Sequence, residues 1–173
     1  MISNKLNENG LKVFMTGSQY SLFSKRVGDK VIDEIEEIAL KNNINPDNIY
    51  SAKQVHGDNI EYCDGDNGDK FLYGRTFEDT DGLITDKKDI VLMIKISDCT
   101  PIIIYDKSKK IQASLHSGWR GTSKKISKKC IDIMKSEFNS NIEDLVAFIG
   151  PTIDYKNYEK IAKFVGDFYE NRI

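Results

Sequence analysis

The sequence predicts one α+β domain over residues 1–173, a layered sandwich in which helices cover a mixed β-sheet. Three observations indicate this class. Six short apolar segments typical of strands lie between two stretches with helical periodicity. The run Ile102–Ile104 is continuously apolar, which is typical of a strand covered on both faces. The length of 173 residues is that of a single globular domain built from layers of secondary structure.

Helical periodicity marks three segments of the chain. In Gly28–Asn43 the apolar side chains recur at helical spacing and Pro46 follows, which predicts an amphipathic helix. In Thr122–Phe138 an apolar stripe lies opposite a row of lysines, which predicts a second helix and places Cys130 in the core. A last helix is expected over Tyr158–Tyr169.

The strand segments are separated by polar connections. Residues 111, 113 and 115 are apolar and alternate with polar ones, which indicates a half-buried strand. Residues 64–69 form an acidic, glycine-containing turn that lacks the glutamate needed to complete a calcium-binding loop. The predicted strands are Asn48–Val55, Asn59–Cys63, Asp81–Thr85, Ile90–Ile96, Pro101–Tyr105, Ile111–Leu115 and Leu145–Ile149.

Composition narrows the class of protein. The chain carries 25 Lys and Arg against 27 Asp and Glu, a net charge of -2, which argues against a nucleic-acid-binding surface. No apolar run approaches the roughly 20 residues that cross a bilayer, and residues 1–10 lack the apolar core of an export signal. We therefore expect a cytoplasmic protein without membrane contact. Its three cysteines are then expected to be thiols or metal ligands.

Three residues with metal-binding or nucleophilic chemistry fall at the ends of predicted strands. The only two histidines, His56 and His116, each end a strand close to a glycine, and Cys99 lies between two strands. One cysteine and two histidines are a sufficient protein ligand set for a catalytic zinc, which keeps a fourth position open. Their separations of 43 and 17 residues match no local zinc motif, so spacing alone leaves the assignment open.

Two other interpretations of these residues remain. The histidines are also compatible with hydrogen bonding to the backbone, and Cys99 with simple packing. A metal-free alternative makes Cys99 a nucleophile, His116 its base and His56 an orienting group. The sequence contains no dinucleotide-binding glycine motif, Walker loop or His-Glu-x-x-His motif, so the common cofactor-binding folds are disfavoured.

A candidate anion site adjoins His116. Residues 118–122 lead directly into the second predicted helix, so backbone N–H groups and the positive helix terminus are expected there. Arg120 adds a guanidinium suited to phosphate or carboxylate, and the alternative is a surface arginine paired with a neighbouring acid. Arg26 is a second candidate anion contact.

Five motifs follow one another along the chain: Gln54-Val55-His56-Gly57, Asp81-Gly82-Leu83-Ile84-Thr85, Asp98-Cys99-Thr100-Pro101, His116-Ser117-Gly118-Trp119-Arg120-Gly121 and Ile149-Gly150-Pro151. Taken in this order, they resemble the motifs of the YfiH-like family. That family is also called polyphenol oxidase or laccase domain, purine nucleoside phosphorylase, and peptidoglycan editing factor. A sixth element, Phe23-Ser24-Lys25-Arg26, is similar to the family's N-terminal Phe-Ser-x-Arg.

This resemblance implies a fold, a metal and a reaction. The fold is an α+β sandwich of the YfiH-like and cysteine-hydrolase-like type, and the metal, usually zinc, is held by His56, Cys99 and His116. The reaction is phosphorolysis of adenosine, inosine, guanosine or methylthioadenosine, with adenosine deamination as a side activity. Copper is the second metal, but the chain's two histidines are too few for the cluster of a multicopper oxidase.

The resemblance also suggests roles for further residues. Arg120, with Arg26, would neutralise phosphate, and Gln54 would orient the substrate. Asp98 is a candidate for proton transfer or for supporting the metal ligands, and equally for a simple turn residue. Purine nucleosides and phosphate are the expected partners, and the protein is expected to be a monomer or small homo-oligomer.

The chain departs from the family pattern near its end. After Pro151 the usual cysteine-bearing stretch is replaced by Thr152–Asn157, and typical members continue past the position of Ile173. We therefore expect a domain that is short at its C-terminus. Three alternatives to the phosphorylase stay open: a metal-independent Cys-His amide hydrolase acting on peptidoglycan precursors, a copper-dependent polyphenol oxidase, and a non-catalytic metal-binding remnant.

Overall fold

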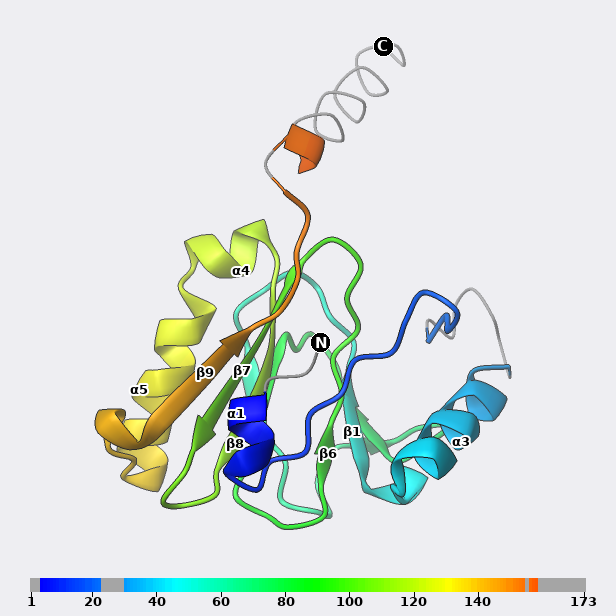
Figure 1. The fold of residues 1–173 in the computed structure, drawn as a ribbon, viewed down its shortest axis with the longest axis horizontal. Helices are drawn as coiled ribbons and strands as arrows, with labels where there is room; N and C mark the ends of the chain where they lie inside the picture. The colour runs from blue at the N-terminus through cyan, green and yellow to red at the C-terminus, as the bar shows by residue number, and fades with distance from the viewer. Residues whose placement is uncertain (1–3, 23–29, 155, 159–173) are drawn as a thin grey trace.

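Two mixed β-sheets, each covered by a helix, form the body of the molecule (Figure 1). The structure is a computed structural model, and it describes residues 4–22, 30–154 and 156–158. The strand order is β3-β4-β1-β6 in one sheet and β2-β5-β8-β7-β9 in the other. The α+β class and the layered arrangement predicted from the sequence are confirmed.

The elements follow one another along the chain as short segments. The helices are α1 (Asn4–Glu8), α3 (Lys30–Asn42), α4 (Trp119–Ser123) and α5 (Ile126–Phe138), with 3-10 turns at Pro46–Asn48 and Ile142–Asp144. The strands are β1 (Ile49–Ala52), β2 (Ile60–Tyr62), β3 (Asp69–Lys70), β4 (Arg75–Phe77), β5 (Gly82–Thr85), β6 (Val91–Leu92), β7 (Thr100–Asp106), β8 (Gln112–Ser117) and β9 (Leu145–Ile149).

The five-stranded sheet carries the main core. Strand β8 lies at its centre, antiparallel to both β5 and β7. Ile104 and Leu115 from these strands pack with Cys130 of α5, which confirms Cys130 as a core residue. On the opposite face, Ile103 of β7 packs against the cluster that contains Leu6 of α1. The continuous apolar run in β7 is therefore covered on both faces, as its sequence predicts.

Strand β1 connects the two sheets through its alternating side chains. Ile49 packs into the cluster formed with Val31 and Ile35 of α3. Its neighbour Tyr50 points to the other side and packs with Leu83 of β5, so this cluster lies between the sheets. The successive layers are therefore α3, the four-stranded sheet, the five-stranded sheet and α5.

Two predicted elements differ from the structure for identifiable reasons. The helix expected over Thr122–Phe138 is interrupted, because Lys125 adopts a left-handed backbone conformation with a φ of 61°. This residue separates α4 from α5. The strand expected over Ile90–Ile96 shrinks to the two residues of β6, because the backbone N–H and carbonyl of Lys95 bond to the side chain of Gln54.

Other short elements were not expected from the sequence. Strand β3 lies at the edge of the acidic turn, and β4 pairs with β1 although two of its three residues are polar. Helix α1 is only five residues long, which is too short for periodicity to reveal. The predicted helix Tyr158–Tyr169 falls almost entirely outside the described residues.

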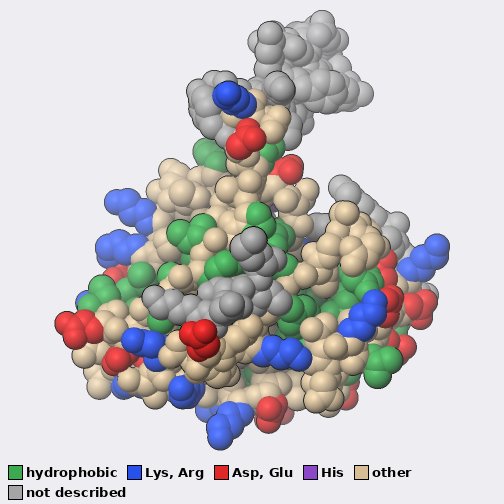
Figure 2. Space-filling model, viewed as in Figure 1, with side chains coloured by type: hydrophobic (Ala, Val, Ile, Leu, Met, Phe, Trp, Pro, Cys, Tyr) green, Lys and Arg blue, Asp and Glu red, His purple; other side chains and the backbone are tan. Residues whose placement is uncertain are grey.

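The surface carries charges of both signs. On the face shown in Figure 2, lysine and arginine side chains alternate with aspartate and glutamate around the rim, and hydrophobic side chains lie nearer the centre. No patch of one sign dominates this face. In the described part of the chain, no helix is both long and apolar enough to cross a membrane.

Replacing the central core leucine tests the importance of β8. Leu115 has no solvent exposure, whereas Leu40 on α3 is 85% exposed and provides a matched control. We expect Leu115→Ala to lower the free energy of unfolding by about 2–5 kcal/mol, because it removes buried methyl groups and leaves a cavity. Leu40→Ala is expected to change it by less than about 0.5 kcal/mol. Urea denaturation followed by circular dichroism measures both, and equal losses would contradict this account of the core.

Candidate metal centre

Two loop residues and one strand residue meet at one end of the five-stranded sheet. One ligand atom from each of His56, Cys99 and His116 lies within 4.8 Å of the others. Sheet register explains part of this meeting: Thr100 of β7 is paired with Ser117 of β8, so Cys99 emerges beside His116. His56 arrives from the loop that follows β1. The structure thus brings together the three residues that the sequence predicts as ligands.

The orientation of His116 is set by a buried carboxylate. Its Nδ1 lies 2.7 Å from Oδ1 of Asp81, and the two residues are 3% and 0% exposed. The backbone N–H of His116 also donates to the carbonyl of Asp81 at 2.7 Å. An ionised carboxylate only accepts hydrogen bonds, so Nδ1 carries a proton, and in the neutral imidazole the lone pair is then on Nε2. This is the tautomer that a metal ligand requires.

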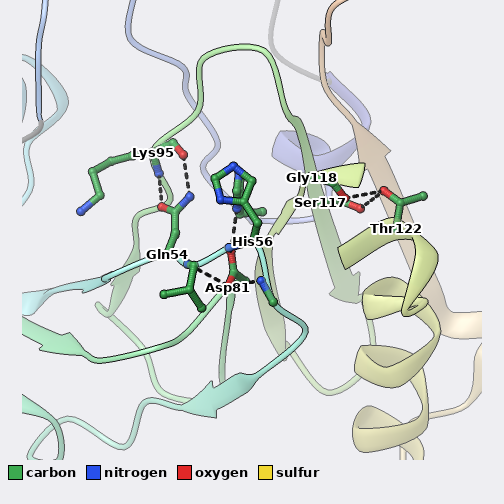
Figure 3. Close-up of polar contacts among 10 residues, drawn as sticks. Gln54, His56, Asp81, Lys95, Ser117, Gly118 and Thr122 are labelled. Carbon is green, nitrogen blue, oxygen red and sulfur yellow. Dashed lines mark hydrogen bonds and ion pairs between the residues drawn. The ribbon is translucent and has the colours of Figure 1, made fainter. Parts of the chain in front are cut away.

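The same carboxylate holds the loop that carries His56 (Figure 3). The backbone N–H groups of Val55, His56 and Gly57 donate to the two oxygens of Asp81 at 3.1, 3.0 and 2.7 Å. His56 reaches this geometry with a φ of 62°, a left-handed conformation that is unfavourable for a non-glycine residue. Three hydrogen bonds to a charged acceptor offset that strain.

A glycine allows the three ligands to approach one another. A Cβ on Gly118 would lie 2.9 Å from Cδ2 of His56 and 3.3 Å from Sγ of Cys99. Behind Cys99, the carbonyl of Asp98 accepts hydrogen bonds from Oγ1 of Thr152 at 2.8 Å and from the N–H of Ile153 at 3.1 Å. The segment after β9 therefore fixes the loop that presents the thiol.

The environment of Cys99 disfavours a free thiolate. Burial raises the pKa of its thiol, and the negative charges of Asp98 and Asp81 raise it further. A bound cation reverses this effect, because it stabilises the thiolate directly. The other two cysteines are fully buried elsewhere, and burial raises the pKa of Cys130 to about 12.

The donor set fits a transition metal. Two imidazole nitrogens and one thiolate are the ligands of many zinc sites, and three protein ligands leave a fourth position open. The three ligand atoms lie within 4.8 Å of one another, close enough for all of them to contact a single ion. Two histidines and a cysteine also bind copper.

A pocket of about 590 Å³ opens beside the ligand cluster. Arg120 of α4 lies in its wall, and among the described residues no carboxylate forms an ion pair with this side chain. Its guanidinium lies 5.1 Å from the ring of Trp119. The pocket is lined by His56, Asp98, Cys99, Thr100, Ser117, Gly118, Trp119, Arg120, Thr122, Thr152, Ile153 and Tyr158.

The remaining predicted site residues have different positions. Asp98 and Arg120 line the pocket. Gln54 does not, because its side-chain amide binds the backbone of Lys95 at 2.7 and 2.8 Å. Arg26 lies outside the described residues. Helix α4 has only five residues, so the long helix expected to begin beside His116 is replaced by a short one with a correspondingly small dipole.

For Asp81 the sequence predicts only a position at the start of a strand, and no role in the site. The contacts of Asp81 join residues 25 and 35 positions away. A signal was present, because an aspartate beside the buried apolar run Leu83–Ile84 needs hydrogen-bond donors to be stable there. The identity of those donors depends on tertiary structure.

Comparison with known proteins gives a consistent set of relatives. The profile described as multi-copper polyphenol oxidoreductase laccase matches residues 20–172. A purine nucleoside phosphorylase of Clostridium acetobutylicum is 42% identical over 112 residues, which are 65% of this chain and 44% of that protein. The Homo sapiens purine nucleoside phosphorylase LACC1 is 28% identical over 149 residues, which are 83% of this chain and 32% of that protein.

Two solved structures share the fold. The YfiH protein of Bacillus licheniformis superimposes with a TM-score of 0.68 and 29% identity, over 72% of this chain and 48% of that one. YlmD of Geobacillus stearothermophilus gives a TM-score of 0.65 and 26% identity, over 71% of this chain and 46% of that one. The chain therefore spans less than half the length of these relatives.

Removing the charge of Asp81 tests whether it supports the ligands. We expect Asp81→Asn to weaken zinc binding about 10–100-fold, because the amide cannot serve both His116 and three backbone N–H groups as an acceptor. Asp66→Asn makes the same chemical change at a fully exposed side chain, and it is expected to leave zinc affinity unchanged. Competition with a chelator measures both at a temperature where circular dichroism shows each variant folded. Equal affinities would contradict the proposed support.

Thiol alkylation tests the accessibility of the three cysteines. We expect iodoacetamide to modify the metal-free native protein once, at Cys99, because Cys63 and Cys130 have no solvent exposure. In denaturant all three should react. Added zinc is expected to slow the native reaction by occupying Sγ. Intact-mass spectrometry counts the adducts, and peptide mapping locates them. Modification at Cys63 or Cys130, or no protection by zinc, would be inconsistent with this site.

Proposed function

Because this chain belongs to the YfiH-like family, whose multi-copper polyphenol oxidoreductase laccase profile covers residues 20–172, we propose that it is a zinc-dependent purine nucleoside phosphorylase. The observation that carries the proposal is the convergence of His56, Cys99 and His116 beside a pocket that His56 and Cys99 line. The names of the relatives from Clostridium acetobutylicum and Homo sapiens support the choice of reaction. Adenosine, inosine, guanosine and methylthioadenosine are the proposed substrates, with adenosine deamination as a side activity.

The reaction requires charge stabilisation at two places, the attacking phosphate and the departing purine. A phosphate oxygen forms a bond to C1′ of the ribose, and the bond from C1′ to N9 of the purine breaks. The purine leaves with the electron pair of that bond and takes up a proton. His56, Cys99 and His116 would hold a metal, which would supply a Lewis acid to the site. Zinc is proposed ahead of copper because the reaction involves no redox step.

Individual residues in and near the pocket are proposed to bind the two substrates and to support the ligand loop. Arg120 binds phosphate through its guanidinium, which has no acidic partner among the described residues and suits paired phosphate oxygens. Arg26 is proposed as a second phosphate contact. The exposed side chain of Asp98 accepts hydrogen bonds from the purine or the ribose, since its negative charge would repel phosphate. Gln54 supports the loop of His56 through the backbone of Lys95.

The family's description as a multicopper oxidase suits this chain poorly. A trinuclear copper cluster needs many histidines, and these 173 residues contain two. Both histidines already belong to the single cluster of ligand atoms found among the described residues. We therefore do not propose phenol oxidation.

A metal-free cysteine amide hydrolase is the second candidate, and one observation favours it. Cys99, His116 and Asp81 stand in the order nucleophile, base and orienting carboxylate, with the last two 2.7 Å apart. The raised pKa of Cys99 counts against it, because a hydrolase of this kind depends on a readily formed thiolate. An amide-linked peptidoglycan precursor is the substrate that would distinguish it.

The phosphorylase proposal predicts phosphate-dependent release of purine. Inosine with phosphate is expected to give hypoxanthine and ribose 1-phosphate, measured by chromatography on protein of known zinc content. His56→Asn should lower kcat/KM by at least about 100-fold and reduce bound zinc, since even groups that only support a ligand are worth 10–100-fold. Asparagine tolerates the left-handed backbone of this exposed position better than alanine does.

A second variant separates phosphate binding from metal binding. Arg120→Gln should keep the zinc and raise the KM for phosphate about tenfold or more, because it removes a charge-assisted contact. Lys128→Gln, at an exposed lysine paired with Asp132, is the matched control and should behave like the unmodified protein. Zinc-loaded protein that releases no purine from any of the four nucleosides, yet cleaves the amide-linked precursor, would reverse the order of the two candidates.

A further inference from the structure

One large aromatic side chain in the pocket wall is exposed to solvent. Trp119 is 61% exposed, although tryptophan is on average a strongly buried residue. It lines the same pocket as His56 and Cys99, which places its ring beside the candidate metal centre. Its only described ring contact is with the guanidinium of Arg120, at 5.1 Å.

Resting on the function proposed above, we propose that Trp119 is the platform on which the purine base of the nucleoside stacks. A flat aromatic base and an indole ring are complementary in shape, and stacking of a base on an aromatic side chain is favourable for every base because each has a π-face. Purines have the larger ring system and cover more of the indole. Trp119 would therefore determine specificity for nucleosides over sugar phosphates, and for purines over pyrimidines.

The neighbouring Arg120 suits this arrangement. Its guanidinium lies over one face of the indole, 5.1 Å from the ring, so the proposed base would stack on the opposite face. In the proposed reaction Arg120 binds the phosphate that attacks the ribose. Two consecutive residues of α4 would thus contact the two substrates, Trp119 the base and Arg120 the phosphate.

A hydroxyl pair in the same wall is suited to the ribose. Oγ1 of Thr122 donates its proton to the carbonyl of Gly118 at 2.9 Å, so the 2.8 Å contact with Ser117 uses the proton of Ser117 Oγ. The lone pairs of Ser117 Oγ then remain available as acceptors. An acceptor here fits a donor such as a ribose hydroxyl and disfavours a phosphate oxygen. Arg120 would therefore bind phosphate, and Trp119 and the hydroxyl of Ser117 would bind the nucleoside.

Fluorescence provides a direct test, because Trp119 is the only tryptophan in the chain. On the zinc-loaded protein, excited at the long-wavelength edge of the indole band, inosine and hypoxanthine are expected to change the emission in a saturable manner. Ribose 1-phosphate should leave the emission unchanged, and uridine should bind more weakly than inosine. A saturable response to inosine supports the stacking platform. No response to inosine at concentrations that saturate its phosphorolysis would overturn it.

Enzyme kinetics of two variants provide a second test of the stacking proposal. Trp119→Ala is expected to weaken inosine binding between about 5-fold and 150-fold, seen as a higher KM for inosine with the KM for phosphate little changed. Trp119→Phe keeps an aromatic face and should recover most of this loss. Zinc content and circular dichroism should match the unmodified protein in both variants, because the side chain is exposed. An unchanged KM for inosine in Trp119→Ala would refute the proposal.

The two proposals fail in distinguishable ways. If Trp119→Ala leaves the KM for inosine in phosphorolysis unchanged, the stacking role is refuted and the proposed function is not. Saturable quenching by inosine and hypoxanthine, with no phosphorolysis by the same preparation, supports the platform and overturns the proposed reaction. A response to every solute, ribose 1-phosphate included, is non-specific quenching and counts against the platform.

Discussion

The site depends on one buried negative charge, the carboxylate of Asp81. Removing a carboxylate from water is costly unless hydrogen bonds replace its hydration. Here four donors do so: three consecutive backbone N–H groups of the loop at residues 55–57 and Nδ1–H of His116. Since every one of these donors belongs to a candidate ligand or its immediate neighbour, satisfying the charge and assembling the ligands are the same event. The loop of His56 and the end of β8 cannot separate without exposing an unpaired buried charge.

The third ligand reaches the cluster through different forces. Cys99 makes none of the hydrogen bonds to Asp81, and its position follows from the pairing of β7 with β8 and from the contacts of Asp98 with Thr152 and Ile153. Close approach then depends on Gly118, where any side chain would press against His56 and Cys99. The geometry of the three ligands therefore depends on three conditions: the pairing of β7 with β8, the buried carboxylate of Asp81, and the lack of a side chain at Gly118.

The local sequence pattern was sufficient to predict the elements that bury a whole face. It was insufficient where a single contact determines where an element ends. The periodicity of α3 and the apolar run of β7 predicted both correctly, because burial imposes those patterns on many residues at once. The break at Lys125 and the shortening of the strand around Lys95 each depend on a single residue, a left-handed backbone and the side chain of Gln54. The ligands were recognisable from the resemblance of their motifs. Asp81 needed the structure, since its partners lie far away in the sequence.

The three candidate ligands differ in solvent exposure, and this difference determines from which side a substrate could reach them. His116 is 3% exposed and bound to Asp81, Cys99 is half-buried, and His56 lies open to the pocket. A metal at this site would thus have a buried ligand, His116, and a ligand open to the pocket, His56. That open side carries Trp119, an aromatic face, and Arg120, a cation with no acidic partner among the described residues. Rigid support behind the metal and accessible recognition groups in front are what a reaction between a nucleoside and phosphate requires of such a site.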